Sequence, residues 1–165
     1  MSSSGILVKR HAGYDLRLLL VNVLMNDPTL TTATYEDEHG NNIKVRIYDT
    51  VPPGVKKPYI AIGKAAINID ERQTKDLFID KYLVEIDIFT HYGGKKQVSE
   101  IMNDVIFALS SAWASDPQQL QFPEESPFLI GTFEIGVRGE DVSVWGAKEA
   151  EHDVLTCNVQ VAQVL

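Results

Sequence analysis

The sequence has little of what a disulfide-rich, membrane-spanning or nucleic-acid-binding protein needs. Its single cysteine, Cys157, excludes an intrachain disulfide and is typical of a reducing compartment. The most apolar stretch, residues 16–25, is interrupted by Arg17 and Asn22 and is far shorter than the ~20 residues that cross a bilayer. Only 15 basic residues stand against 23 acidic ones, giving a formal charge of −8. This balance argues against sequence-independent binding of nucleic acid.

What remains is the composition of an ordinary globular protein. The chain has 165 residues, of which 44% are apolar and 23% charged. That length favours one domain with a core that needs no disulfide or metal. We therefore expect a single domain over residues 1–165, with residues 1–12 as a flexible leader. The N-terminus lacks the apolar segment of a secretory signal.

Two helices are predicted from apolar residues at helical spacing. The first covers residues 14–26 and ends at the Asn-Asp-Pro that begins at Asn26. The second begins near Lys95 and ends before Pro117. The apolar stripe of the second helix comprises Val98, Ile101, Met102, Val105, Leu109 and Ala112, and Trp113 continues it. Glu100, Asn103 and Asp104 lie opposite and are expected in water.

Strands are predicted where apolar and polar residues alternate, at residues 43–48, 77–90 and 153–165. Residues 59–63 and 128–137 are also expected to be strands, whereas residues 51–58 and 139–150 are expected to be loops. The pattern predicts an α+β fold: a mostly antiparallel sheet, two main helices packed on one face, and a long projecting β-hairpin with a charged turn at residues 71–75.

Residue patterns that carry chemistry are absent or weak. The Gly93-Gly94-Lys95-Lys96 segment lacks the spacing of a phosphate-binding loop. The four histidines show no metal-ligand spacing. Cys157 lies on an apolar strand face and is expected to be a buried structural thiol. Glu85 and Asp87 share a strand face but have no predicted pocket. We therefore expect no catalytic, cofactor or metal site.

The segment from Arg46 to Trp113 resembles the tail completion (tail terminator) family of long-tailed bacteriophages and prophages. The likeness rests on a series of short motifs: Arg46-Ile-Tyr-Asp49, the proline loop from Val51, Pro58-Tyr-Ile-Ala-Ile-Gly63, the alternating strand Leu83–Thr90, and the helix Gly94–Trp113. A leading helix and the closing strand Asp153–Leu165 also have counterparts. Residues 118–146 carry no family signature.

The resemblance implies a non-enzymatic virion protein without cofactors. Such a protein forms a hexameric ring on the tail tube, ends tube growth and presents a head-docking surface. Its partners would be other copies of itself, the tail tube protein and the head–tail connector or neck protein, with DNA passing through the ring without specific binding and no membrane involved. It would reside in the virion tail after assembly in the cytoplasm of the bacterial host.

Other functions stay open at this point. The chain is also compatible with another head-completion or neck protein. A small cytoplasmic enzyme or ligand-binding domain is a further alternative, with a pocket that includes His91, Glu85 and Asp87. A third is an adaptor that binds by strand addition at an open sheet edge.

Two hypotheses follow for the ring. Because a closed ring needs one patch to meet a different patch on the neighbour, we expect the hairpin around Glu71, Arg72 and Lys75 to reach the adjacent subunit. Trp145, in a predicted loop, is a further candidate contact because aromatic residues concentrate at interfaces. The negative charge of the chain also predicts an acidic lumen that repels passing DNA.

Overall fold

A computed structural model describes residues 10–37, 39–69, 78–90, 95–145 and 148–163. Its helices are α1 (Gly13–Met25), α2 (Pro28–Thr32) and α3 (Lys95–Ala114). Its strands are β1 (Thr34–Glu36), β2 (Asn42–Lys44), β3 (Arg46–Tyr48), β4 (Tyr59–Ile69), β5 (Phe78–Thr90), β6 (Phe128–Trp145) and β7 (Lys148–Gln163). No described helix is long and apolar enough to cross a membrane.

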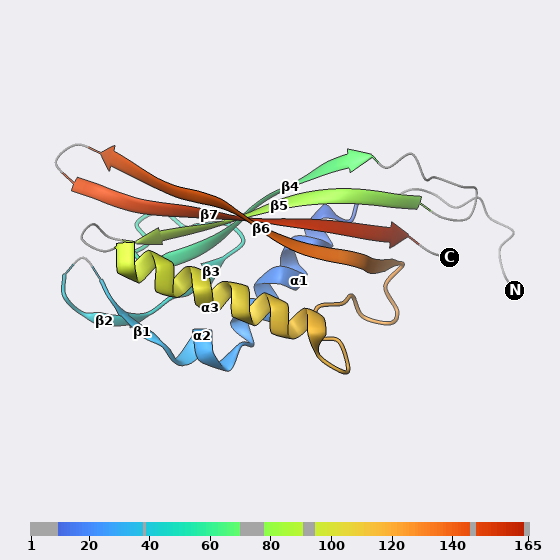
Figure 1. Cartoon of the computed structure of the whole chain (residues 1–165), viewed down its shortest axis with the longest axis horizontal. Helices are drawn as coiled ribbons and strands as arrows, with labels where there is room; N and C mark the ends of the chain where they lie inside the picture. Colours follow the sequence, from blue (N-terminus) through green and yellow to red (C-terminus); the bar gives the residue numbers. More distant parts are fainter. Residues whose placement is uncertain (1–9, 38, 70–77, 91–94, 146–147, 164–165) are drawn as a thin grey trace, which may run out of the picture.

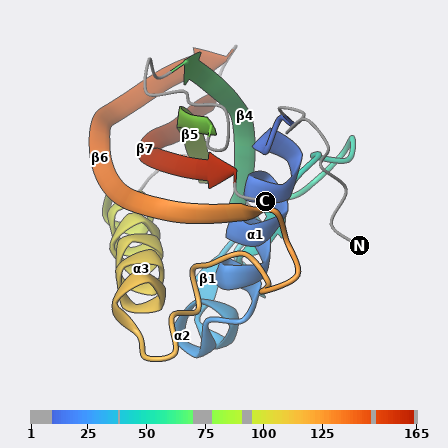
Figure 2. The same cartoon turned by 90° about the vertical axis from the view of Figure 1, so that its right-hand side faces the viewer.

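The main sheet has the strand order β3-β4-β5-β7-β6, and β1 pairs with β2 in a separate small sheet. Only the β3–β4 pair is parallel; the other neighbours in the main sheet are antiparallel. The three helices lie on one face of this strongly twisted sheet (Figures 1 and 2). The predicted α+β fold, with a mostly antiparallel sheet and its main helices on one face, is confirmed.

The core lies between the helices and the sheet face that they cover. From α1 it receives Leu16, Leu20 and Leu24, at the helical spacing that predicted this element. In β5 every second residue from Asp80 to Thr90 is buried, so the period-two pattern is also confirmed. Trp113 is partly buried, and its ring packs against Phe133 of β6.

A short helix that the sequence analysis missed follows α1 directly. The chain does leave α1 at Asn26, as predicted, but Asp27 then starts α2. The Asp27 side chain accepts a hydrogen bond from the N–H of Leu30 (2.9 Å), and Pro28 occupies the first turn. An acidic N-cap followed by proline is a helix start signal, so the same three residues end one helix and begin another. Leu30 is buried and ties α2 to the core.

Several predicted boundaries are wrong. The strand expected at residues 59–63 continues as β4 to Ile69. Residues 43–48 form two strands in different sheets, β2 and β3, which the buried Val45 separates. Residues 139–150 are not a loop, because β6 and β7 pair up to Trp145 and Lys148. The β6–β7 register shifts between Val137 and Gly139, so the alternation changes phase at a bulge. This phase change hides a long strand from pattern analysis.

The β4–β5 hairpin is present as an antiparallel pair from Tyr59–Phe89 to Ile69–Asp80, with an irregularity between Ile62 and Ala65. Its turn, residues 70–77, lies outside the described residues. The projection of this hairpin therefore stays a prediction.

Residues 10–12, the end of the expected leader, contact the sheet. The Arg10 N–H donates to Gln163 Oε1 (2.7 Å), and the Ala12 N–H donates to the Tyr82 hydroxyl (2.9 Å). Ala12 is itself buried. These bonds set the start of α1 against strands β5 and β7. Residues 1–9 lie outside the described ranges.

The turn between β1 and β2 is organised by the buried Asp37. Its Oδ1 accepts hydrogen bonds from the N–H groups of His39 (2.9 Å) and Asn41 (2.8 Å). Burial opposes ionisation of this carboxyl, but the two N–H donors outweigh that effect and hold its pKa below the ordinary value. The ionised form therefore stabilises the folded state.

This charge predicts a pH-dependent contribution to stability. A lowered folded-state pKa stabilises the protein above the unfolded-state value, about 3.9, and the benefit is lost as the pH falls through the folded-state pKa. We expect Asp37→Asn to be destabilising at pH 7 and less destabilising at pH 3. Urea unfolding at both values measures this, and an equal difference at pH 7 and pH 3 would contradict it.

Candidate assembly surface

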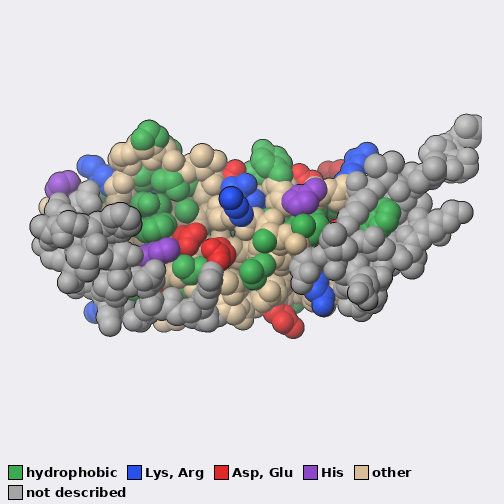
Figure 3. Space-filling model, turned by 90° about the horizontal axis from the view of Figure 1, so that it is seen from above, with side chains coloured by type: hydrophobic (Ala, Val, Ile, Leu, Met, Phe, Trp, Pro, Cys, Tyr) green, Lys and Arg blue, Asp and Glu red, His purple; other side chains and the backbone are tan. Residues whose placement is uncertain are grey.

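The face of the main sheet that points away from the helices is covered by no other described element (Figure 1). Strand register places Ala66, Leu83, Asn158 and Glu134 in one row across this outer face. Figure 3 looks onto it and shows apolar side chains between scattered acidic, basic and histidine side chains. We call this surface the outer sheet face. A large uncovered sheet face in an α+β subunit is suited to contact with other proteins.

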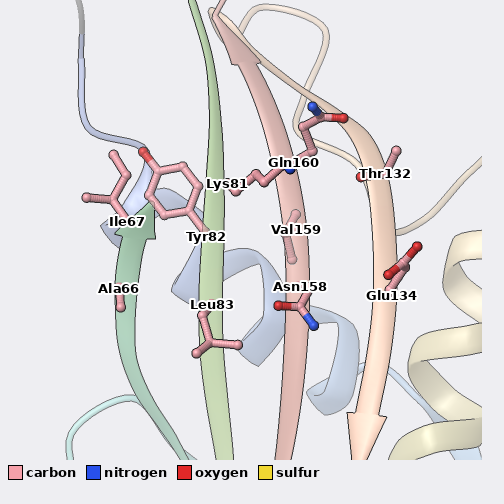
Figure 4. Close-up of a pocket in the computed structure, with 10 residues that line it drawn as sticks. All are labelled: Ala66, Ile67, Lys81, Tyr82, Leu83, Thr132, Glu134, Asn158, Val159 and Gln160. Atoms are coloured by element: carbon pink, nitrogen blue, oxygen red, sulfur yellow. The ribbon is translucent and has the colours of Figure 1, made fainter. Parts of the chain in front are cut away.

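A shallow hollow lies on the outer sheet face. It encloses about 580 Å³ and is lined from four strands. Figure 4 shows Lys81 and Leu83 projecting from β5, Asn158 from β7 and Glu134 from β6. Its lining mixes single charges of both signs with amides and one exposed leucine. No group of three or more His, Cys, Asp or Glu side chains that suits a metal ion occurs within the described ranges.

A row of rings crosses the outer sheet face near the start of β4. Phe89 stacks on Tyr59, with 4.9 Å between the ring centroids. It also stacks on His152, with 4.2 Å between the centroids and 7° between the planes of Phe89 and His152. Tyr59 and His152 are the cross-strand partners of Phe89 in β4 and β7. Tyr48 of β3 packs edge-on against Tyr59. These half-buried rings link four strands and stiffen this end of the sheet.

Asp87 holds His152 at the end of this row. His152 Nε2 lies 2.8 Å from Asp87 Oδ1, and both side chains are about one-fifth exposed. Burial, and secondarily the charge of Asp87, raise the pKa of Tyr59. The alternative enzyme reading joined Asp87 and Glu85 to His91, which lies outside the described residues. The structure instead pairs Asp87 with His152, in a ring stack that leaves the imidazole face covered by Phe89.

Cys157 is not available as a nucleophile. It lies buried in β7 on the face that packs under the helices. Burial raises the pKa of its thiol to about 12, so the reactive thiolate is scarce at neutral pH. The predicted role of a buried structural cysteine is confirmed.

The two edge strands of the main sheet are β3 and β6. At the start of β6 the edge is occupied by a side chain. The Ile130 N–H donates to Gln121 Oε1 (2.7 Å), and Gln121 Nε2 donates to the Ile130 carbonyl (3.2 Å). This carboxamide takes the place of a neighbouring strand, so an added strand can pair with β6 only beyond residue 130.

The predicted contact residues are placed only in part. Glu71, Arg72 and Lys75 lie outside the described residues. The loop placement of Trp145 is wrong, because Trp145 ends β6 and pairs with Lys148. Asp104, expected in water, instead accepts a hydrogen bond from the Tyr35 hydroxyl (2.7 Å) and joins β1 to α3. Burial and this bond raise the pKa of Tyr35.

Several surface residues were not foreseen. The ring row needs the strand register, which no local pattern supplies. Phe107, by contrast, had a signal in the sequence, because it falls four residues after Asn103 on the polar side of α3. It is 64% exposed. An aromatic residue on the water-facing side of an amphipathic helix is a contact candidate.

The family comparison covers the helical layer and the first half of the sheet. A family model described as "Tail completion protein gp17" matches residues 19–124, from within α1 to the segment that precedes β6. No curated protein matches the chain. The matched range contains the proline loop, β4, β5 and α3, which are the elements that carried the resemblance in the sequence.

Proposed function

Since the matched range exceeds half of its length, the chain belongs to the bacteriophage tail completion family, and we propose that it closes the end of the tail tube as a hexameric ring. In this role it ends tube growth and presents the surface on which the head docks. Its partners are other copies of itself, the tail tube protein and the head–tail connector. It assembles in the cytoplasm of the bacterial host, and it acts as a structural protein without catalysis.

The observation that carries this proposal is the uncovered outer sheet face. The hydrophobic core lies on the other side of the sheet, between the strands and the helices. The helices bury one side of the sheet, so the fold does not need the other side for stability. A mixed surface of this kind resembles the protein-binding surfaces of non-obligate complexes more than a ligand pocket. It supports contact with large, flat protein partners.

We place the first neighbour contact at the β4–β5 hairpin. In this proposal Glu71, Arg72 and Lys75 at its turn reach the adjacent subunit, and Trp145 at the far end of β6 makes a second contact. The antiparallel β4–β5 pairing provides a rigid base for such a turn. Contacts between unlike patches close into a ring if the rotation between subunits fits.

The acidic part of the outer sheet face is the candidate for the lumen, and the rest of that face is left for contact with protein partners. Glu85, Asp87 and Glu134 lie on it, together with Lys81 of β5. Six copies of a chain with charge −8 make a strongly negative ring. A lumen with this charge would let DNA pass without binding it.

The proposal is tested by solution mass over a wide concentration range, using native mass spectrometry and light scattering. A species at six times 18.4 kDa, ring-shaped in negative stain, is expected. The triple change of Glu71, Arg72 and Lys75 to Ala is expected to leave the monomer folded and to abolish the ring.

The matched control changes Lys56, Lys96 and Glu100 to Ala, because these exposed residues have the same charges but lie elsewhere. It should assemble as wild type does. If the wild-type chain is monomeric in solution, both variants are added to unfinished tails and tube length is measured. Binding to tail-free heads instead of headless tails would overturn the tail role in favour of a head-completion or neck role.

A further inference from the structure

We infer that neighbouring copies join by inserting Phe107 of one subunit into an apolar groove beside α1 of the next. The inference rests on the proposed ring and names a contact that the hairpin does not supply. It is carried by two unlike patches, one on α3 and one beside α1.

Phe107 is the exposed half of this contact. Its side chain is 64% exposed, whereas Val105 and Leu109 on the other side of α3 are fully buried. Its neighbours on the same side, Ser110 and Ser111, are small and exposed. Small polar residues around a large aromatic leave the ring free to enter a cavity. Aromatic residues in such positions dominate binding energy when a partner covers them.

The receiving half is a groove between α1 and the segment before β6. We call it the α1 groove; it encloses about 450 Å³. It is lined by Asp15, Leu18, Leu19, Asn22, Gln121, Phe122, Pro123, Ser126 and Pro127. The hydrogen bonds between Gln121 and Ile130 hold one wall against β6. The groove is therefore preformed.

The rest of α1 also points to a covered surface. Tyr14 and Met25 are exposed by 62% and 55%, and only Asp15 and Arg17 in the helix are charged. A helix that is apolar nearly all round is typical of burial on several sides. Among the described elements α1 contacts the sheet, α2 and α3, which leaves Tyr14 and Met25 exposed. A partner on the outer flank completes the burial.

The low charge of both patches favours a second copy of the chain as the partner. The chain carries 38 charged residues, and none lies between Val105 and Ser115. The nearest charge along α3 is Asp104, one turn before Phe107, and its carboxylate accepts a hydrogen bond from the Tyr35 hydroxyl. The α1 groove has one, Asp15. Two charge-poor patches with apolar centres match each other in the way that interface cores do.

The positions of the two patches set the type of contact. Figure 2 shows α3 at one side of the helical layer and α1 at the other. Phe107 lies on α3 and the groove lies beside α1, so the two patches are unlike surfaces on different elements of one subunit. Repeating such a head-to-tail contact gives a ring when it closes.

Two single variants test the contact. Phe107→Asp removes the inserted ring and leaves the groove intact, while Leu18→Asp charges the groove and leaves Phe107 intact. Each is expected to weaken self-association about 30-fold or more. Lys96→Asp, an exposed change at the far end of α3, is the matched control and should assemble as wild type does. Circular dichroism checks that all variants are folded.

Mixing the two defective variants is the decisive measurement. Phe107 of the Leu18→Asp chain still fits the groove of the Phe107→Asp chain, so the mixture should form a dimer that grows no further. Native mass spectrometry should find it at twice 18.4 kDa. Where wild type assembles only on tails, tube capping is scored: each variant alone should fail, and the Lys96→Asp control should cap.

The outcomes separate this contact from the proposed function. If wild type assembles or caps and Phe107→Asp does so equally well, the contact is overturned and the ring stands. A mixture that stays monomeric while wild type assembles also overturns it. If wild type neither self-associates nor caps tails, both the ring and the contact are overturned.

Discussion

Ile86→Ala is expected to lower the free energy of unfolding by about 2–5 kcal/mol, the range for large-to-small changes in tightly packed cores. Ile86 is fully buried in β5, the central strand of the main sheet. Its cross-strand partners on the same face are Ile62 and Leu155, which are also buried. Removing three carbon atoms there leaves a cavity with backbone on both sides, and the neighbours cannot collapse into it.

Leu83→Ala, three residues earlier in the same strand, is the matched control. Leu83 points to the outer sheet face and is 38% exposed, so its loss should change stability by less than about 1 kcal/mol. Urea unfolding followed by circular dichroism measures both variants. Equal losses for Ile86→Ala and Leu83→Ala would mean that the two sheet faces are equally buried in solution. That result would contradict the arrangement of helices on one face.

Tyr82→Phe is expected to lower the free energy of unfolding by about 1–3 kcal/mol, because one hydrogen bond is lost. The Tyr82 hydroxyl accepts from the N–H of Ala12, and both residues are about 1% exposed. The phenylalanine ring fills nearly the same volume, but the Ala12 N–H is then buried without its acceptor. A buried donor without a partner costs more than the net value of the bond. The change should loosen the start of α1 first.

Tyr14→Phe removes a hydroxyl from a tyrosine at the start of α1 that is 62% exposed. Water replaces a lost partner there, so the unfolding free energy should stay within about 0.5 kcal/mol of wild type. Hydrogen exchange at the Ala12 amide gives a local measurement. Faster exchange in Tyr82→Phe but not in Tyr14→Phe is expected; unchanged exchange in both would show that this bond does not hold the segment.

The helices and the central strand were predictable because their burial repeats at a fixed spacing. Leu16, Leu20 and Leu24 recur every fourth residue, and β5 alternates over its whole buried stretch. In each such element, the spacing of the apolar residues shows which side faces the core. The long β6–β7 hairpin was only half predicted, because the register shift at Gly139 changes which residues of the strand face the core. A loop and a bulged strand then look alike.

The candidate surfaces divide in the same way. Phe107 was detectable from its place on the polar side of α3, where local spacing is sufficient. The stack of Tyr59, Phe89 and His152 was not, because those residues lie far apart in the chain and meet only through the strand register. The α1 groove likewise joins residues around 18 and 122. Neither segment indicates a groove when taken alone.

Local sequence was sufficient for the class of fold, the buried thiol of Cys157 and the family, since composition, periodicity and short motifs are properties of neighbouring residues. Tertiary structure decided which face of the sheet stays uncovered and which distant side chains stand together on it. The physical reason is that side chains on adjacent strands meet according to register, and register is set by the packing of the whole core. Asp104 shows the difference at a single residue. Its helical position predicts exposure to water, yet Tyr35, 69 residues away, takes it as a partner.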